Sequence, residues 1–310
     1  MKTLPTILKL PVDHEPEAGI PIPLGRRVEL PGRGTTFVRE VPGPPGAPTL
    51  VLLHGWIASG GINWFQAFEP LGRHFRVLAP DMRGHGRGLR SRRRFRLADC
   101  ADDVAAMMDE MGVHDAVMVG YSMGGPVAQL VWKRHRTKVR GLVLAATSNN
   151  FVPGMRARLT FTTMMAAMAG TSRVGQFAAL LPRSIAKQFT PVRASVRPDT
   201  LQRWAAAEMR RHDLRMILEA GQAIGRFNAK WVGDIDVPTA AIITTRDRAV
   251  TPSQQAKMAF AIPGASIHRI EDGHVVCASP TFAAPLVEAC LDVAVKAYPA
   301  WKPDRRRVDR

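Results

Sequence analysis

The sequence predicts an α/β fold, a mostly parallel twisted sheet flanked by helices, with a helical cap inserted into it. Three observations carry this prediction. Short apolar runs alternate with amphipathic, helix-like segments through most of the chain. Several of the runs are apolar throughout, as expected for strands that are covered on both faces. The alternation stops between about residues 150 and 230, where the chain has a helical character instead.

The predicted elements follow one another in a regular order. Residues 1–33 are rich in proline and glycine with little periodicity, so we expect an N-terminal extension there. Strands are predicted at residues 35–38, 50–53, 75–79, 116–119, 142–145, 239–243 and 266–270. Helices are predicted at residues 98–111, 126–132 and 281–297.

This order divides the chain into parts. The core has a first section at residues 34–149 and a second at residues 232–300. Residues 150–231 lie between them and form the helical cap. Residues 301–310 form a basic tail, which we expect to be a solvated chain end.

The composition is that of an ordinary globular protein, and we expect no metal and no cofactor. The chain has 310 residues with 46% hydrophobic content, enough to bury a large core. Its cysteines, Cys100, Cys277 and Cys290, are widely spaced and form no C-x-x-C pair, so they are expected as small buried residues in a reducing compartment. Lysine and proline interrupt the N-terminus before a signal core could form, and no run reaches about 18 apolar residues. We therefore expect a cytoplasmic protein, with peripheral membrane association left open.

The formal net charge of +17 is the unusual bulk property. Much of it lies in one predicted loop, at Arg83, Arg87, Arg90, Arg92, Arg93, Arg94 and Arg96. More lies in the tail, at Arg305, Arg306, Arg307 and Arg310. A nucleic-acid partner is not expected, because the charge is not attached to any recognisable nucleic-acid-binding motif.

The segment Gly120-Tyr121-Ser122-Met123-Gly124 places a serine between a predicted strand and a predicted helix. A sharp turn brings neighbouring backbones close together, and glycine has no Cβ to clash there. Such a turn exposes the Ser122 hydroxyl at the edge of the sheet. A serine hydroxyl is unreactive at neutral pH, so a nucleophilic Ser122 also needs a base, a group that orients the base, and donors for an oxyanion.

The sequence offers a candidate for each of these roles. Asp247 follows the strand at residues 239–243, and His274 follows the strand at residues 266–270. The ends of parallel strands lie at one edge of a sheet, so these side chains are expected to meet Ser122. Either residue alone would be explained as well by a helix cap or a loop histidine. The backbone N–H groups of Trp56 and Met123 are the expected oxyanion donors, with His54 in a structural role.

Together with the segment Asp81-Met82-Arg83-Gly84-His85-Gly86, these motifs resemble the α/β-hydrolase superfamily over about residues 33–300. The resemblance implies the α/β-hydrolase fold with a triad of Ser122, His274 and Asp247, in the family's chain order of serine, acid and histidine. Related haloalkane dehalogenases and epoxide hydrolases carry an aspartate at the position of Ser122, so their chemistry is not expected. We expect a serine esterase or lipase that forms an acyl-enzyme, with phospholipase and thioesterase activity as variants.

Alternatives remain open at this stage. Proteins with the same triad also hydrolyse carbon–carbon bonds in ring-opened aromatic diketones. A non-catalytic membrane- or nucleic-acid-binding protein on the same fold is a further alternative.

Two sequence features bear on the substrate. The methionine- and phenylalanine-rich cap would line an acyl pocket or form the cap's own core. Arg92, Arg93 and Arg94 would gather an anionic leaving group or contact an anionic membrane, or else form a solubilising loop. The expected partner is a small-molecule or lipid ester, and no obligate protein partner is evident.

Overall fold

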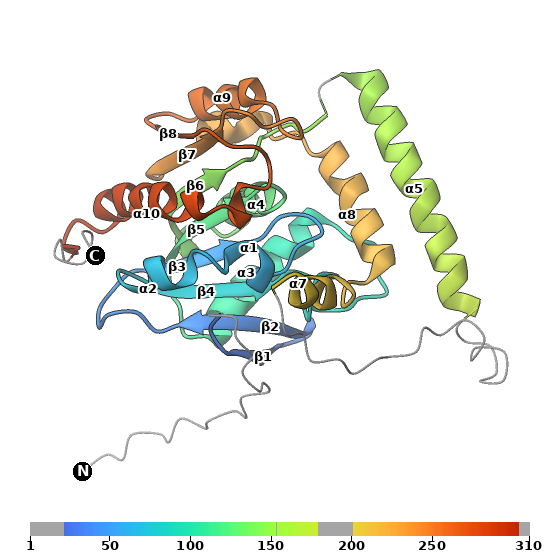
Figure 1. The fold of residues 1–310 in the computed structure, drawn as a ribbon, viewed down its shortest axis with the longest axis horizontal. Helices are drawn as coiled ribbons and strands as arrows, with labels where there is room; N and C mark the ends of the chain where they lie inside the picture. Colours follow the sequence, from blue (N-terminus) through green and yellow to red (C-terminus); the bar gives the residue numbers. More distant parts are fainter. Residues whose placement is uncertain (1–21, 153, 179–200, 304–310) are drawn as a thin grey trace, which may run out of the picture.

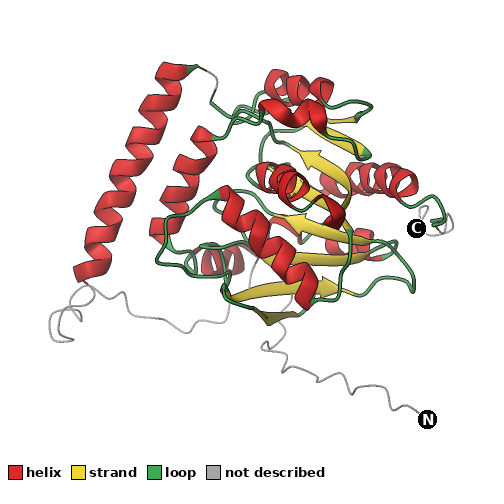
Figure 2. Ribbon diagram, turned by 180° about the vertical axis from the view of Figure 1, so that it is seen from behind, coloured by secondary structure: helices red, strands yellow, loops and turns green. Residues whose placement is uncertain are grey.

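The computed structural model describes residues 22–152, 154–178 and 201–303, and these form an eight-stranded sheet with helices on both faces (Figures 1 and 2). The sheet order is β1-β2-β4-β3-β5-β6-β7-β8. The strands are β1 (Gly25–Leu30), β2 (Gly34–Val41), β3 (Thr49–Leu53), β4 (Arg76–Asp81), β5 (Ala116–Tyr121), β6 (Val139–Ala145), β7 (Thr239–Thr244) and β8 (Ser266–Ile270). Strands β1 and β2 pair in antiparallel fashion, and the sheet is parallel from β4 onward. The predicted α/β fold with a mostly parallel sheet is confirmed.

The helices cover the two faces of the sheet in distinct groups. In the described ranges they are α1 (Gly60–Trp64), α2 (Phe68–Gly72), α3 (Leu97–Glu110), α4 (Gly124–Arg134), α5 (Met155–Ala178), α7 (Leu201–Met209), α8 (Leu214–Arg226), α9 (Pro252–Ala261) and α10 (Ala283–Ala297). Short 3-10 helices lie at Arg136–Lys138, Lys230–Asp234, Val276–Ala278 and Pro280–Phe282. One hydrophobic core joins α3, α4 and α9 to the sheet, and a second joins α1, α2 and α10 to the opposite face.

Strand β3 contributes side chains to both hydrophobic cores. Its residues are apolar without interruption, and successive side chains point to opposite faces of a sheet. Val51 and Leu53 pack in the core under α3 and α4. Leu50 and Leu52 pack in the core under α10. A continuous apolar run is thus what a strand buried on both faces requires.

The sheet begins earlier in the chain than expected. Residues 25–30, which we expected in the N-terminal extension, form edge strand β1 and pair with β2. Val28 and Leu30 are buried while Arg27 and Glu29 are not, so the segment alternates as a strand covered on one face does. The boundary expected at residue 33 therefore divides a β-hairpin.

The described part of residues 150–231 is mostly helical. Helices α5 and α8 lie side by side beyond the edge of the sheet that is formed by the carboxyl ends of the parallel strands (Figures 1 and 2). Helix α7 precedes α8 in the chain. Residues 179–200 of the expected cap lie outside the described residues, as do residues 1–21 of the extension and residues 304–310 of the tail. Within the described ranges, every helix is too short or too polar to cross a membrane.

Candidate active site

Ser122 occupies a strained turn between β5 and α4. Its φ angle is +50°, a left-handed conformation that side chains rarely adopt. A Cβ at Gly120 would lie 2.5 Å from the carbonyl oxygen of Gly124, and a Cβ at Gly124 would lie 2.0 Å from the carbonyl oxygen of Leu53. Close backbone contact therefore requires both glycines, as the sequence analysis expected. The Ser122 carbonyl is held by the Thr147 hydroxyl, which donates to it at 2.7 Å.

The structure brings Ser122, His274 and Asp247 together. The Ser122 Oγ lies 2.9 Å from His274 Nε2, and His274 Nδ1 lies 2.7 Å from Asp247 Oδ2. The Asp247 carboxylate can only accept, so His274 Nδ1–H donates a hydrogen bond to it, and Nε2 is left to accept the hydrogen bond of the serine hydroxyl. The residues follow the ends of β5, β7 and β8, so one edge of the parallel sheet gathers all three.

Asp247 is held as a buried carboxylate. Its Oδ1 accepts the backbone N–H groups of Ala249 and Val250 at 2.8 and 2.9 Å, and its Oδ2 accepts the Thr244 hydroxyl at 2.9 Å. Burial alone would raise the pKa of Asp247, but the hydrogen bonds from His274, Val250 and Thr244 keep the pKa below its ordinary value. The carboxylate is therefore ionised at neutral pH and can stabilise a positive charge on His274.

Tyr121 fixes the backbone of the histidine loop. Its hydroxyl donates to the carbonyl oxygen of His274. Burial raises the pKa of Tyr121, so the phenol stays protonated and keeps this donor. No role for Tyr121 was predicted from the sequence. The signal was its place in an otherwise apolar strand, since a buried tyrosine hydroxyl needs a polar partner.

The loop after β3 lies against the nucleophile. A Cβ built on Gly55 would be 3.5 Å from the Cβ of Ser122, and the Gly55 N–H is anchored on Asn63 Oδ1 at 2.9 Å. In the described part of the chain, no hydrogen bond uses the backbone N–H of Trp56 or Met123. Both donors are therefore available for a substrate oxygen beside Ser122.

His54 serves the packing of this loop. Its Nε2 accepts the Met82 N–H at 2.9 Å, and its Nδ1 donates to the Gly55 carbonyl at 2.8 Å. Complete burial lowers the pKa of His54 to about 4, so the ring is neutral and suited to both contacts.

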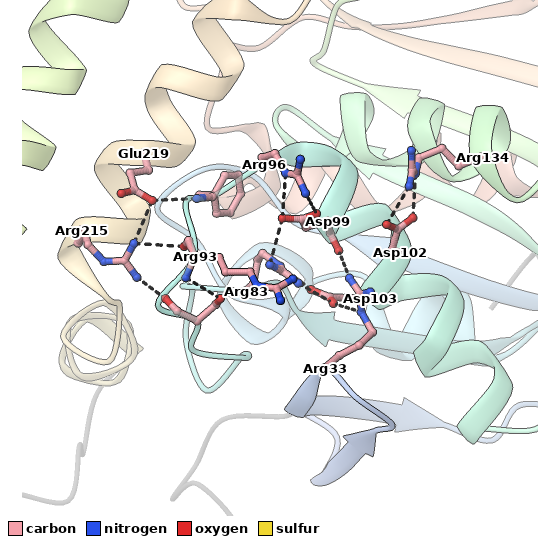
Figure 3. Close-up of polar contacts among 12 residues, drawn as sticks. Arg33, Arg83, Arg93, Arg96, Asp99, Asp102, Asp103, Arg134, Arg215 and Glu219 are labelled. Atoms are coloured by element: carbon pink, nitrogen blue, oxygen red, sulfur yellow. Dashed lines mark hydrogen bonds and ion pairs between the residues drawn. The ribbon is translucent and has the colours of Figure 1, made fainter.

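Most arginines of the arginine-rich loop make contacts within the fold. Arg83 binds Asp103 in a buried ion pair at 2.6 Å, and Arg96 pairs with Asp99 at 3.1 Å (Figure 3). Arg87 pairs with Glu208 of α7 at 2.9 Å, and Arg90 donates to the backbone carbonyls of Gly86, Gly88 and Arg211. The side chains of Arg92, Arg93 and Arg94 are exposed.

Cap helix α8 holds this loop through a buried ion pair. Arg215 and Glu219 interact at 3.0 Å, and their side chains are 7% and 3% exposed. Arg215 also donates to the carbonyl oxygens of Ser91 and Arg93, while Glu219 accepts the Phe95 N–H at 2.8 Å (Figure 3). Because these carbonyls and this N–H face α8, the backbone of the loop is fixed against the cap.

This chain is similar to known proteins of one fold family. Residues 48–279 match the family described as alpha/beta hydrolase fold. The magnesium-chelatase 30 kDa subunit of Rhodobacter capsulatus is 30% identical over 249 residues, which cover 76% of this chain and 83% of that protein. The pimeloyl-[acyl-carrier protein] methyl ester esterase of Nitrosospira multiformis is 34% identical over 107 residues, which cover 34% of this chain and 40% of that protein.

A solved structure extends the likeness to the whole fold. The esterase of Exiguobacterium antarcticum superposes with a TM-score of 0.68 at 20% identity, covering 86% of this chain and 99% of that one. At this identity the superposition supports the fold and not the activity. The family match over residues 48–279, together with the sheet order and the turn at Ser122, shows that this chain belongs to the α/β-hydrolase fold family.

Proposed function

We propose that this protein is a serine hydrolase that cleaves carboxylic esters through an acyl-enzyme. The observation that carries the proposal is the continuous chain of contacts from Ser122 Oγ to His274 Nε2 and from His274 Nδ1 to Asp247 Oδ2. The pimeloyl-[acyl-carrier protein] methyl ester esterase named above supports the same reaction class over the 107 residues that it shares with this chain.

The reaction follows from the roles of these groups. Ser122 Oγ attacks the ester carbonyl while His274 Nε2 takes the hydroxyl proton, and Asp247 stabilises the imidazolium that results. The Trp56 and Met123 N–H groups bind the oxyanion of the tetrahedral intermediate. His274 then returns the proton to the leaving alcohol. Water attacks the acyl-enzyme in the same manner and releases the carboxylate.

The finer proposal is a lipolytic substrate with an apolar acyl chain and an anionic group. Ile57 and Val275 follow Trp56 and His274 directly, and their side chains are 44% and 70% exposed, so apolar surface adjoins the candidate site. Arg92, Arg93 and Arg94 are exposed on a loop that is fixed to the cap, which suits them to a phospholipid head, a thioester carrier or an anionic membrane.

The first test of the proposal is covalent labelling with a fluorophosphonate probe, together with hydrolysis of p-nitrophenyl butyrate and palmitate. We expect the native protein to be labelled, and Ser122→Ala to lose labelling and at least about 10³-fold in kcat. Ser148→Ala, which alters another buried serine near the site, serves as the matched control and should retain both. Labelling that persists in Ser122→Ala would refute the role of this serine.

The arginine loop has a separate test. Replacing Arg92, Arg93 and Arg94 with serine should reduce kcat/KM for an acyl-CoA and for anionic phospholipid vesicles, and leave p-nitrophenyl butyrate unchanged. Charge attraction should make the loss greatest at low salt. The control variant removes three exposed cations elsewhere, at Lys257, Arg269 and Lys302. Equal effects of the two triple variants would show that net charge alone matters and would contradict a specific role for the loop.

A second candidate function comes from the Rhodobacter capsulatus relative, which aligns with 76% of this chain. That protein is named as a subunit of magnesium chelatase, so a role beside a metal-chelating enzyme is the alternative to ester hydrolysis. The labelling experiment separates the two candidates. A native protein that is neither labelled nor active on esters would favour the subunit role, or a non-catalytic binding role for the basic surface.

A further inference from the structure

The side chain of Trp56 joins the loop beside Ser122 to the cap. Its indole Nε1–H donates to the carbonyl oxygen of Ile217 in α8 at 2.8 Å. The ring lies against Gly221, where an added Cβ would come within 2.7 Å of Trp56 Cζ2 and 3.1 Å of Cη2. The indole is thus held in a notch of α8 formed by Ile217 and Gly221.

The glycine explains why the indole can reach this carbonyl. In an α-helix, the carbonyl of residue 217 accepts the N–H of residue 221, one turn further on. A side chain at position 221 would therefore flank the Ile217 carbonyl and block the indole. Glycine is a poor residue for the middle of a helix, so its presence here favours a packing role.

The loop around Trp56 needs external support. Ile57, the next residue, has a φ angle of +59°, which is strongly disfavoured for a β-branched side chain. A residue in such a conformation keeps it only where its surroundings impose it. Asn63 anchors the loop at the Gly55 N–H, and the notch in α8 anchors it at the Trp56 side chain.

We propose that Trp56 is a positioning residue through which cap helix α8 sets the oxyanion donor of the site. This inference rests on the proposed ester hydrolysis, in which the Trp56 N–H binds the oxyanion. The same residue supplies the donor from its backbone and the cap contact from its side chain. A change in the position of α8 therefore changes the direction of the Trp56 N–H and leaves the positions of Ser122, His274 and Asp247 unchanged.

Helix α8 contains a matched pair of glycines for testing this inference. A Cβ at Gly221 would press on Trp56 and lie 3.0 Å from Met165 Sδ of α5, whereas a Cβ at Gly225 would press on α5 alone, 2.6 Å from Phe161 Cδ1. Both substitutions to alanine improve helix propensity equally, and both crowd an aromatic ring that packs against α8. The difference between Gly221→Ala and Gly225→Ala thus isolates the contact with the oxyanion loop.

The measurement is kcat and KM for p-nitrophenyl butyrate, with active sites counted by complete fluorophosphonate labelling. Removal of an entire oxyanion donor lowers kcat by about 10²–10³-fold, and we expect the displaced donor of Gly221→Ala to lose about 10-fold per labelled serine. KM should stay within about twofold, because ground-state binding makes little use of this donor. Binding of a trifluoromethyl ketone, whose adduct carries an oxyanion, should weaken in parallel with kcat/KM. Gly225→Ala should remain within about twofold of the native protein in all three quantities.

A second variant covers the case in which Gly221→Ala folds poorly. Trp56→Phe keeps an aromatic ring but removes the indole N–H, while the Ile217 carbonyl keeps its helical partner. We expect kcat to fall at an unchanged thermal midpoint. Equal kcat values in the two glycine variants, or a native kcat in Trp56→Phe, would overturn the inference about Trp56. A native protein that fails to be labelled would instead overturn the proposed function on which it rests.

Discussion

At the scale of single residues, backbone crowding decides the architecture of the candidate site. Gly120 and Gly124 meet neighbouring carbonyls, and Gly125 makes room for Thr147, whose hydroxyl would otherwise be 2.2 Å from an added Cβ. That hydroxyl holds the Ser122 carbonyl. The strained φ angle of Ser122 is thus supported from the loop after β6 as well as by its own turn. A motif that specifies only positions 120, 122 and 124 leaves this support out.

At the scale of elements, helix α8 links two loops that leave neighbouring strands of the sheet. Arg215, Glu219 and Gln222 recur at helical spacing and bind the arginine-rich loop after β4. Ile217 and Gly221 lie on another side of the same helix and bind Trp56 after β3. One cap helix therefore fixes both the exposed arginines and the candidate oxyanion loop.

The buried ion pair of α8 predicts a large effect on stability. Glu219→Ala leaves the charge of Arg215 buried without its carboxylate partner and removes the acceptor of the Phe95 N–H, so we expect a loss of about 3–5 kcal/mol in the free energy of unfolding. Urea denaturation measures this change. The control is Glu271→Ala, which breaks an exposed pair with Arg246 and should cost less than about 1 kcal/mol. Similar losses in the two variants would contradict a structural role for the buried pair.

The contacts of these elements show what the sequence could predict. The strands around Ser122, Asp247 and His274 were predictable because apolar runs and strand-end positions are local signals. The pairing of Arg83 with Asp103 was not, because only the folded chain brings together a loop and a helix about 20 residues further on. Edge strand β1 was missed because its alternation covers only six residues in a segment rich in proline and glycine.

The same limit applies to the contact between Trp56 and α8. It joins residues 161 positions apart, and nothing in the local sequence of either segment specifies the partner. The sequence could therefore suggest which backbone groups act as oxyanion donors, but not the contact between Trp56 and α8.

At the scale of the whole molecule, two buried histidines and a half-buried one lie where the core meets the cap. The rings of His54 and His85 are 5.1 Å apart, and those of His85 and His212 are 5.5 Å apart. His212, which precedes α8, accepts the Gly86 N–H. Burial lowers the pKa of all three residues, and the nearby Asp81 only partly offsets this effect at His54 and His212. The histidines are therefore neutral in the folded protein at pH values at which they would be charged in the unfolded chain.

This difference predicts that acid weakens the fold well above the pH at which carboxylates titrate. As the pH falls from 6.5 toward 4, an unfolded His54 takes up a proton that the folded protein excludes, so its contribution to stability is complete above pH 6.5 and is lost within this window. Because of His54 alone, we expect the free energy of unfolding to fall by about 1 kcal/mol between pH 7.5 and pH 5.5. His85 and His212 should lower it further over the same interval.

Urea denaturation at pH 7.5, 6.5 and 5.5 tests this prediction with a matched pair of variants. In His54→Gln, the side-chain oxygen can still accept the Met82 N–H but cannot titrate, so the stability lost between pH 7.5 and pH 5.5 should shrink by about 1 kcal/mol. His114→Gln, which alters an exposed histidine, should keep the native pH dependence. A native stability that stays flat or rises on acidification would mean that the buried histidines accept protons as readily in the folded protein as in the unfolded chain.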